Sequence, residues 1–377
     1  MAFFFVLRFS LVLFILIAGY RIQLKTKKGN YKQPYWYVAI PAVFIYSVVE
    51  GFRYGRGADY ISYSLTFTGQ KHINYEPIFL YFTELFKFFD IHFSIAFVLC
   101  SILLIVSGFI LVKNTRFNSH YAIPLFFLAT ISQSENLVRM FVAFSFLIIG
   151  ISFLQKRKIK KASIFFVIGC LNHYSLIFVI PFVMLFYFRN NPFKNIYVIL
   201  SIFIISNLLV PSMESIVYYF DFIPNLSLYS NYTSNLDIWL LGEGLEEGES
   251  SFSVFYYIRF YLIPFILLFY GYNLIKKYEL FKFGVFYHLY FIGTILSPIA
   301  IEAPTEVIYR ITLYFTMFSF MVTAFILYDM QRNFKSLNIL KRFIFGFLIF
   351  DSVYLILKST YTYSEVWGNL FIWDINY

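Results

Sequence analysis

The chain has 377 residues, of which 60% are hydrophobic, 24% aromatic and only 13% charged, and its mean hydropathy is +0.71. Soluble domains contain about 25% charged residues, so this composition excludes that class and indicates a polytopic membrane protein. The net charge of +10 comes from basic residues dispersed over short loops, which argues against a nucleic-acid-binding protein.

Apolar stretches follow one another along the whole chain, and we expect an all-α polytopic membrane protein with about 11–12 transmembrane or membrane-inserted helices. No polar stretch is long enough to bury a core of its own. A single membrane-embedded domain over residues 1–377 is therefore predicted. The predicted spans are 3–18, 35–49, 93–112, 121–132, 137–154, 162–188, 196–210, 253–274, 281–301, 307–328 and 343–357.

Basic residues set the predicted orientation of these spans. A basic stretch at 21–32 follows the first span, so the positive-inside rule places the N-terminus outside. Residues 211–251 contain acidic residues but no Lys or Arg, so this long stretch is predicted to be an external loop, as are residues 51–75. Aromatic residues in the long loop suit stacking on sugar rings, and an interfacial aromatic belt explains them as well.

The segment 51–60, which follows the second span, combines two arginines, three glycines and a carboxylate. Arginine presents a planar fork that suits phosphate, and glycine lets backbone amides approach an anion. We therefore predict a site for an anionic substrate at Arg53 and Arg56, with Asp59 as a base. The structural alternative is a salt bridge between Arg53 and Asp59 that anchors the turn.

Residues 76–90 form the next informative stretch, because apolar residues recur there at helical spacing while Glu84 and Lys87 take the other face. We predict an amphipathic helix at the outer interface, bordering a groove for a lipid-linked substrate or simply covering loop ends. Glu76 begins this helix.

The span at 162–188 has two possible forms. At 1.5 Å per residue it gives roughly 40 Å, which suits one tilted helix. Two short arms that meet near His173 would instead place the downstream loops on the sides that their charges favour, and we favour this bent hairpin. His173 then either caps the bend or contacts substrate.

Four further arginines lie outside the predicted cytoplasmic loops: Arg8, Arg139, Arg259 and Arg310. A charge near bilayer depth is costly, so pairing or function is expected. Arg310 follows Glu306 by four residues, which also fits an intrahelical pair. Arg259 has aromatic neighbours on which it can stack, or it can snorkel.

Several short segments, in order along the chain, resemble the signature regions of the EpsG family, which is related to Wzy-type polysaccharide polymerases. They are residues 51–53, 57–60, 76–79, 138–143, the basic turn at 156–161, 170–175 and 309–314. The resemblance implies that undecaprenyl-pyrophosphate-linked oligosaccharides are joined into a capsule, O-antigen or exopolysaccharide. This glycosyl transfer is expected at the external face of a bacterial inner membrane, and a flippase and a chain-length regulator are expected partners.

No cofactor and no metal are expected, because guanidinium groups can stabilise a departing pyrophosphate. The predicted catalytic residues are Asp59, Arg53, Arg56, Arg139 and His173. The predicted substrate-binding residues are Tyr60, Glu76, Arg259, Glu306 and Arg310. Two other classes stay open: a flippase or exporter of lipid-linked saccharides, and a glycan ligase or acyltransferase.

Overall fold

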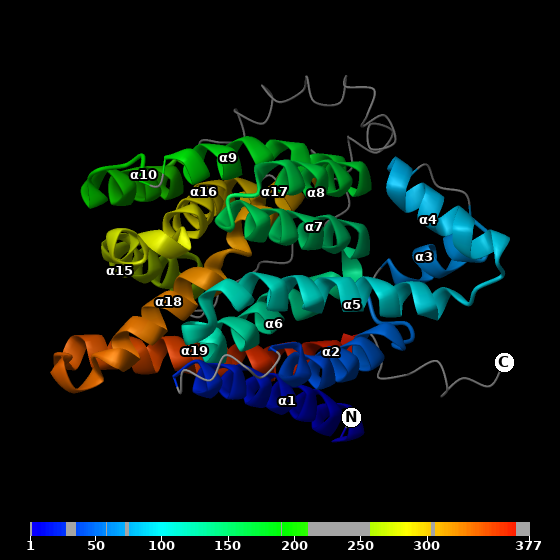
Figure 1. Ribbon diagram of the computed structural model, residues 1–377, viewed down its shortest axis with the longest axis horizontal. Helices are drawn as coiled ribbons and strands as arrows, with labels where there is room; N and C mark the ends of the chain where they lie inside the picture. The colour runs from blue at the N-terminus through cyan, green and yellow to red at the C-terminus, as the bar shows by residue number, and fades with distance from the viewer. Residues whose placement is uncertain are drawn as a thin grey trace. The chain divides into compact units, whose positions relative to one another are not determined.

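The computed structural model describes residues 2–27, 35–57, 59–71, 75–189, 191–209, 257–302 and 306–366. Within these ranges the chain is helical and has no strand, which confirms the all-α prediction (Figure 1). It divides into two compact units, unit 1 with Met1–Ile177 and Thr323–Tyr377, and unit 2 with Phe178–Val322. The single-domain prediction stays a prediction, and the predicted loop at 211–251 lies outside the described residues.

Six stretches of the described chain are long and apolar enough to cross a membrane. They are Val6–Gln23, Phe93–Ile131, Val138–Gln155, Ile258–Lys277, Phe283–Ala300 and Ile308–Arg332. Shorter apolar helices cover Tyr35–Gly51, Tyr174–Phe188 and Ile196–Leu208. The chain is therefore a multi-pass membrane protein, as its composition predicts.

Unit 1 is built on four long helices that pack against one another (Figure 1). They are α1 (Ala2–Lys27), α2 (Tyr35–Gly51), α5 (Phe93–Val112) and α6 (Ser119–Asn136). Helix α5 has the bounds that its apolar run predicts, because a basic turn with Lys113 follows at once. The C-terminal helix α19 (Ile339–Val366) packs on α1 and α6.

Two further helices of unit 1 form an antiparallel pair. Leu137, with φ −94° and ψ 52°, interrupts the helix between α6 and α7 (Val138–Gln155). A short basic turn then leads into α8 (Ile159–Asn172), which returns along α7 with Gly150 against Phe166 and Gly169 against Ala143. The end of α8 therefore lies beside the beginning of α7.

The span predicted over 162–188 consists of two helices. Helix α8 ends at Asn172, His173 is extended with φ −156° and ψ 108°, and a 3₁₀ turn at Tyr174–Phe178 leads to α9 (Ile180–Phe188). The single-helix alternative is wrong, and the break falls at the predicted residue. The hydrogen bond between the His173 and Ser175 side chains, 2.6 Å long, stabilises the turn after the break.

Two short helices follow the glycine-rich segment. Helix α4 (Pro77–Phe88) confirms the predicted helix, and Pro77 at its first turn is favourable there. Helix α3 (Tyr60–Phe67) is a correction, because this region was predicted to be loop. Its residues Tyr60, Tyr63 and Phe67 share one face and pack with residues of α4 and α5 in a buried aromatic cluster.

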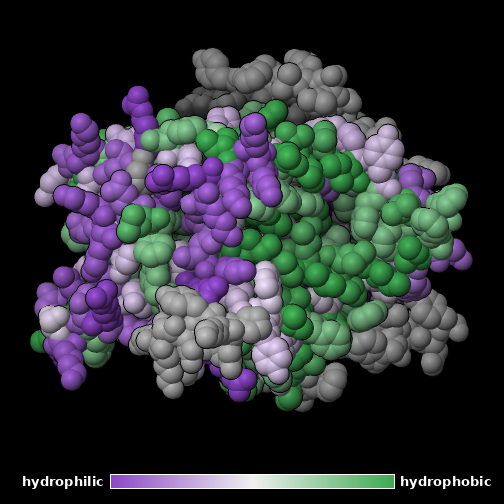
Figure 2. All heavy atoms as spheres, in the orientation of Figure 1, coloured by the Kyte–Doolittle hydropathy of each residue, from purple (hydrophilic) through white to green (hydrophobic). Residues whose placement is uncertain are grey.

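The apolar residues of α4 are divided between the protein and its outside. Phe79 and Phe86 are buried, whereas Leu85 and Phe89, which belong to the predicted apolar face, are exposed. Tyr81 and Phe88 are also exposed, at 74% and 81%. Figure 2 shows hydrophobic side chains on the part of unit 1 that carries α3 and α4. An outward apolar surface on such a helix fits the predicted position at a membrane interface.

Unit 2 is organised around α16 (Phe283–Glu302), whose residues Phe283, Phe286 and Tyr287 are fully buried. The helices that pack against it are α9, α10 (Ile196–Leu208), α15 (Ile263–Lys277) and α17 (Glu306–Thr316). The span predicted over 307–328 is interrupted, since α17 ends at Thr316 and α18 (Ser319–Arg332) begins shortly after it. Helix α18 continues into unit 1.

Candidate functional site

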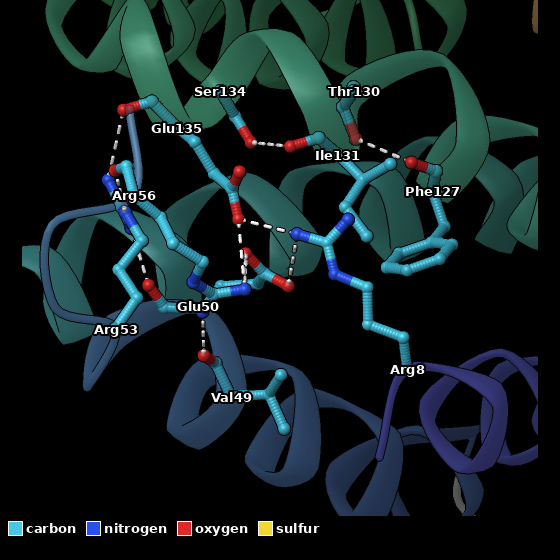
Figure 3. A network of polar contacts seen from close by, with 10 residues as sticks. All are labelled: Arg8, Val49, Glu50, Arg53, Arg56, Phe127, Thr130, Ile131, Ser134 and Glu135. Carbon is cyan, nitrogen blue, oxygen red and sulfur yellow. Dashed lines mark hydrogen bonds and ion pairs between the residues drawn. The ribbon is translucent and has the colours of Figure 1, made fainter. Parts of the chain in front are cut away.

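Five charged side chains meet in the interior of unit 1, and we call this group the buried charge cluster (Figure 3). Its members are Arg8, Glu50, Arg53, Arg56 and Glu135, with exposures of 1%, 2%, 3%, 0% and 1%. They come from α1, α2, the glycine-rich segment and α6. Charges this deeply buried are stable only when they are paired.

Glu135 is the centre of the buried charge cluster. Its Oε1 accepts a hydrogen bond from Arg8 Nη2 at 2.6 Å and lies 3.1 Å from Arg56 Nη1. The Glu50 carboxylate lies 3.8 Å from Arg8 and 4.0 Å from Arg56. Burial alone would raise the pKa of Glu135, but the guanidiniums of Arg8 and Arg56 hold that pKa below its ordinary value. Glu135 is therefore a carboxylate that bridges two cations.

The guanidinium of Arg53 binds backbone rather than a carboxylate. It donates hydrogen bonds to the main-chain oxygen of Glu50, to that of Glu135 at 3.3 Å and to that of Arg56 at 3.4 Å. It also lies over the ring of Phe97, 4.8 Å from the centroid. These contacts close the glycine-rich segment into a turn, and they take the place of the salt bridge to Asp59 that was predicted as an alternative.

Gly57 brings this turn into direct contact with the end of α6. Its φ is +104°, and a Cβ added there would lie 2.4 Å from the main-chain oxygen of Glu135. Gly69 has a similar φ of +77°, but a Cβ there would meet open space. A comparison of substitutions at the two glycines therefore distinguishes the effect of backbone strain from the effect of a steric clash.

We expect Gly57→Ala to lower the free energy of unfolding by more than Gly69→Ala does. Gly69→Ala should cost about 1–2 kcal/mol, the strain of a left-handed residue alone. Gly57→Ala adds the clash with Glu135 and should disturb the buried charge cluster. Thermal unfolding of the two purified variants measures the difference, and equal losses would contradict this account of Gly57.

A second group lies where α3 and the start of α4 meet the first turn of α7, and we call it the Arg139 patch: Asp59, Tyr63, Tyr75, Glu76 and Arg139. The Arg139 guanidinium forms an ion pair with Glu76, donates to the Tyr63 hydroxyl at 3.4 Å and lies 4.5 Å from the Tyr75 ring centroid. The side chains of Arg139 and Glu76 keep 14% and 9% of their surface exposed. A ligand can therefore reach this arginine more readily than those of the buried charge cluster.

Asp59 lies one helical turn before Tyr63, whose backbone N–H donates to the Asp59 main-chain oxygen at 3.0 Å. It is half-buried at the N-cap position of α3, where its side chain makes no capping hydrogen bond. Burial raises the pKa of the Tyr75 hydroxyl to about 12, although its hydrogen bond with the Thr66 hydroxyl lowers that pKa. The Arg139 charge also lowers this pKa, and the Asp59 charge raises it. Tyr75 is thus close enough to respond to both charges.

The remaining predicted residues of unit 1 lie near this group or inside the protein. His173 is 5% exposed and, because α8 runs antiparallel to α7, it lies at the same end of that pair as Arg139. Tyr60 is buried in the aromatic cluster and stacks on Phe97 at 5.2 Å. The structure brings Glu76 and Arg139 into contact, whereas Arg53 and Arg56 lie in the interior; the roles predicted for these residues stay predictions.

The last three predicted residues belong to unit 2. Arg259 is half-buried in a π-helical turn at Ile258–Leu262, and Arg310 is half-buried in α17. Glu306 is the first residue of α17, and its side chain lies outside the described residues. The predicted pair between Glu306 and Arg310 therefore stays a prediction.

Sequence reasoning expected Arg8 to pair or to function but gave it no place in the site, and it did not consider two other members of the buried charge cluster, Glu50 and Glu135. Each is a charged residue within or at the end of an apolar stretch, where a charge is costly unless it has a partner. That signal indicates that each of them pairs with another charge or has a function. It does not say which charge pairs with which, since the pairing requires the packing of α1 and α2 against α6.

Comparison with known proteins supports the family resemblance. The model of the EpsG family matches residues 35–370 of the chain. This match includes every predicted site residue and begins after Arg8. No curated protein and no solved structure matches the chain.

Proposed function

Because the chain belongs to the EpsG family, we propose that it polymerises lipid-pyrophosphate-linked oligosaccharides into a surface polysaccharide. Family membership supports the general role of a polymerase-type enzyme; the substrate and the chemistry are the proposal. One observation supports a site at Arg139: its guanidinium pairs with a carboxylate, lies over the Tyr75 ring and keeps 14% of its side chain exposed, more than any arginine of the buried charge cluster.

In the proposed reaction, a hydroxyl of one oligosaccharide attacks the anomeric carbon of another that is linked to lipid pyrophosphate. A glycosidic bond forms, and the bond from that carbon to the pyrophosphate oxygen breaks. The lipid pyrophosphate leaves with the electron pair, and the hydroxyl proton passes to a base. The chemistry therefore needs a cation for the leaving group and a proton acceptor for the nucleophile.

Arg139 is the proposed cation, because a guanidinium that now pairs with the Glu76 carboxylate can also bind the oxygens of a phosphate. Asp59 is the proposed base, since its carboxylate is half-buried and lacks a capping role. His173 is the second candidate for the base. Glu76 would hold Arg139 until substrate arrives, and Tyr60, Arg259, Glu306 and Arg310 stay proposed substrate-binding residues.

The proposal includes a cellular setting. The active face would be the external face of a bacterial inner membrane, with the N-terminus outside, where a flippase delivers substrate and a chain-length regulator limits the product. The outward apolar surface of α4, with Tyr81 and Phe88, supports entry of a lipid-linked substrate beside the Arg139 patch.

The test is a product assay with purified protein in lipid vesicles and one lipid-pyrophosphate-linked repeat unit as both donor and acceptor. We expect a ladder of glycans longer than the unit, and the same ladder when EDTA is present, because arginine supplies the charge. A flippase would leave the repeat unit unchanged, and a ligase or acyltransferase would need a different acceptor. Unchanged substrate in this assay would contradict the proposed function.

A further inference from the structure

Arg8 occupies an unusual place in the chain. It is the third residue of the apolar stretch Val6–Gln23 of α1, and it precedes the segment that the family model matches. A charge at such a place is costly, yet Arg8 is only 1% exposed and donates a 2.6 Å hydrogen bond to Glu135. Helix α1 therefore does more than hold the chain in the membrane.

The contacts of Glu135 show what Arg8 acts upon. The carboxylate of Glu135 is held by Arg8 and Arg56, and its main-chain oxygen accepts a hydrogen bond from Arg53. The close approach of Gly57 fixes the same carbonyl group. One residue at the end of α6 is thus held on several sides by α1 and by the glycine-rich turn (Figure 3).

The end of α6 leads directly to the Arg139 patch. Glu135 is the last residue but one of α6, Leu137 interrupts the helix, and Arg139 is the second residue of α7. The position of Glu135 therefore determines where α7 starts and, with it, where the Arg139 side chain lies. A misplacement of about 1 Å can lower a reaction rate by about 100-fold.

We infer that Arg8 is a positioning residue, which acts through Glu135 to hold Arg139 where it binds the substrate pyrophosphate. This inference rests on the proposed function. Arg8 touches no reacting atom; its effect is carried by the junction between α6 and α7. The first helix, outside the matched family segment, is on this account a part of the site.

The first test combines Arg8→Gln with Arg139→Gln in the polymerisation assay, with activity expressed per folded protein. Arg8→Gln alone should lower kcat/KM by about 10- to 100-fold. In the Arg139→Gln background the same change should have less than about a twofold further effect, because Arg8 acts through Arg139. Equal losses in both backgrounds would overturn the inference. Arg21→Gln, an exposed arginine on the same helix, is the matched control and should leave kcat/KM unchanged.

A second test needs no turnover, so it separates failure of this inference from failure of the proposed function. Hydrogen exchange of the amides of residues 137–141 should become at least about tenfold faster in Arg8→Gln and stay unchanged in Arg21→Gln. Unchanged exchange in both variants would overturn the inference even if the wild type makes no polymer. If Arg8→Gln does not fold, Arg8→Lys, which keeps the charge but not the planar fork, replaces it in both tests.

Discussion

Arg139→Ala is expected to lower the polymerisation rate by at least about 100-fold, the usual cost of removing one group that stabilises charge in a transition state. The physical reason is the developing charge on the pyrophosphate, which the proposed chemistry leaves to this guanidinium. Arg139→Lys should retain part of the activity, because lysine keeps the charge but loses the bidentate fork. Initial rates on lipid-pyrophosphate-linked substrate, per folded protein, measure both effects.

The matched control is Arg332→Ala at the exposed C-terminal end of α18, distant in sequence from the Arg139 patch. It removes the same charge from the protein and should leave the rate unchanged. A folded Arg139→Ala variant that works at the wild-type rate would remove Arg139 from the proposed site. A loss of activity in both variants would indicate a general effect of charge.

Glu135→Gln should cost about 3–5 kcal/mol of stability, the range for breaking a buried ion pair by removing one partner. The change keeps the shape of the side chain but leaves Arg8 and Arg56 buried beside Glu50 as the remaining carboxylate of the cluster. Strong repulsion between the two guanidiniums follows. Thermal unfolding and the yield of monodisperse protein measure the loss.

A surface ion pair provides the comparison for Glu135. Glu84 pairs with Lys87 on α4 at 2.7 Å, but the Glu84 side chain is 54% exposed. Water screens such pairs, so Glu84→Gln should cost less than about 1 kcal/mol. If Glu135→Gln and Glu84→Gln lower the free energy of unfolding by the same small amount, the buried charge cluster does not stabilise unit 1 as described.

Helices were predictable from hydropathy, because an apolar run bounded by basic residues has few other stable forms in a membrane. Helix α5 matches its predicted bounds, and the break at His173 was expected from the charges of the flanking loops. Helix α3 was not predicted, since eight residues give too short a pattern to separate from a loop. Its aromatic spacing at 60, 63 and 67 was the available signal.

The candidate site was predictable only in part. Residue type alone suggested that Arg53, Arg56 and Arg139 bind phosphate, but type cannot distinguish an arginine that faces a substrate from one that faces a buried carboxylate. Arg56 lies beside Glu135, which is far away in the sequence, so its partner is set by tertiary packing. Direct contact of Arg53 and Arg56 with substrate therefore stays a prediction, and the structure adds a role for both in holding the end of α6.

The central claim is that glycosyl transfer from lipid pyrophosphate takes place on this protein. The most direct measurement is the amount of free lipid pyrophosphate released by the purified protein, compared with the number of new glycosidic bonds in the product. The account predicts one lipid pyrophosphate released for each bond formed, with both quantities falling together in Arg139→Ala. Substrate that crosses the vesicle membrane with its lipid pyrophosphate still attached, and with no new bond, would contradict it.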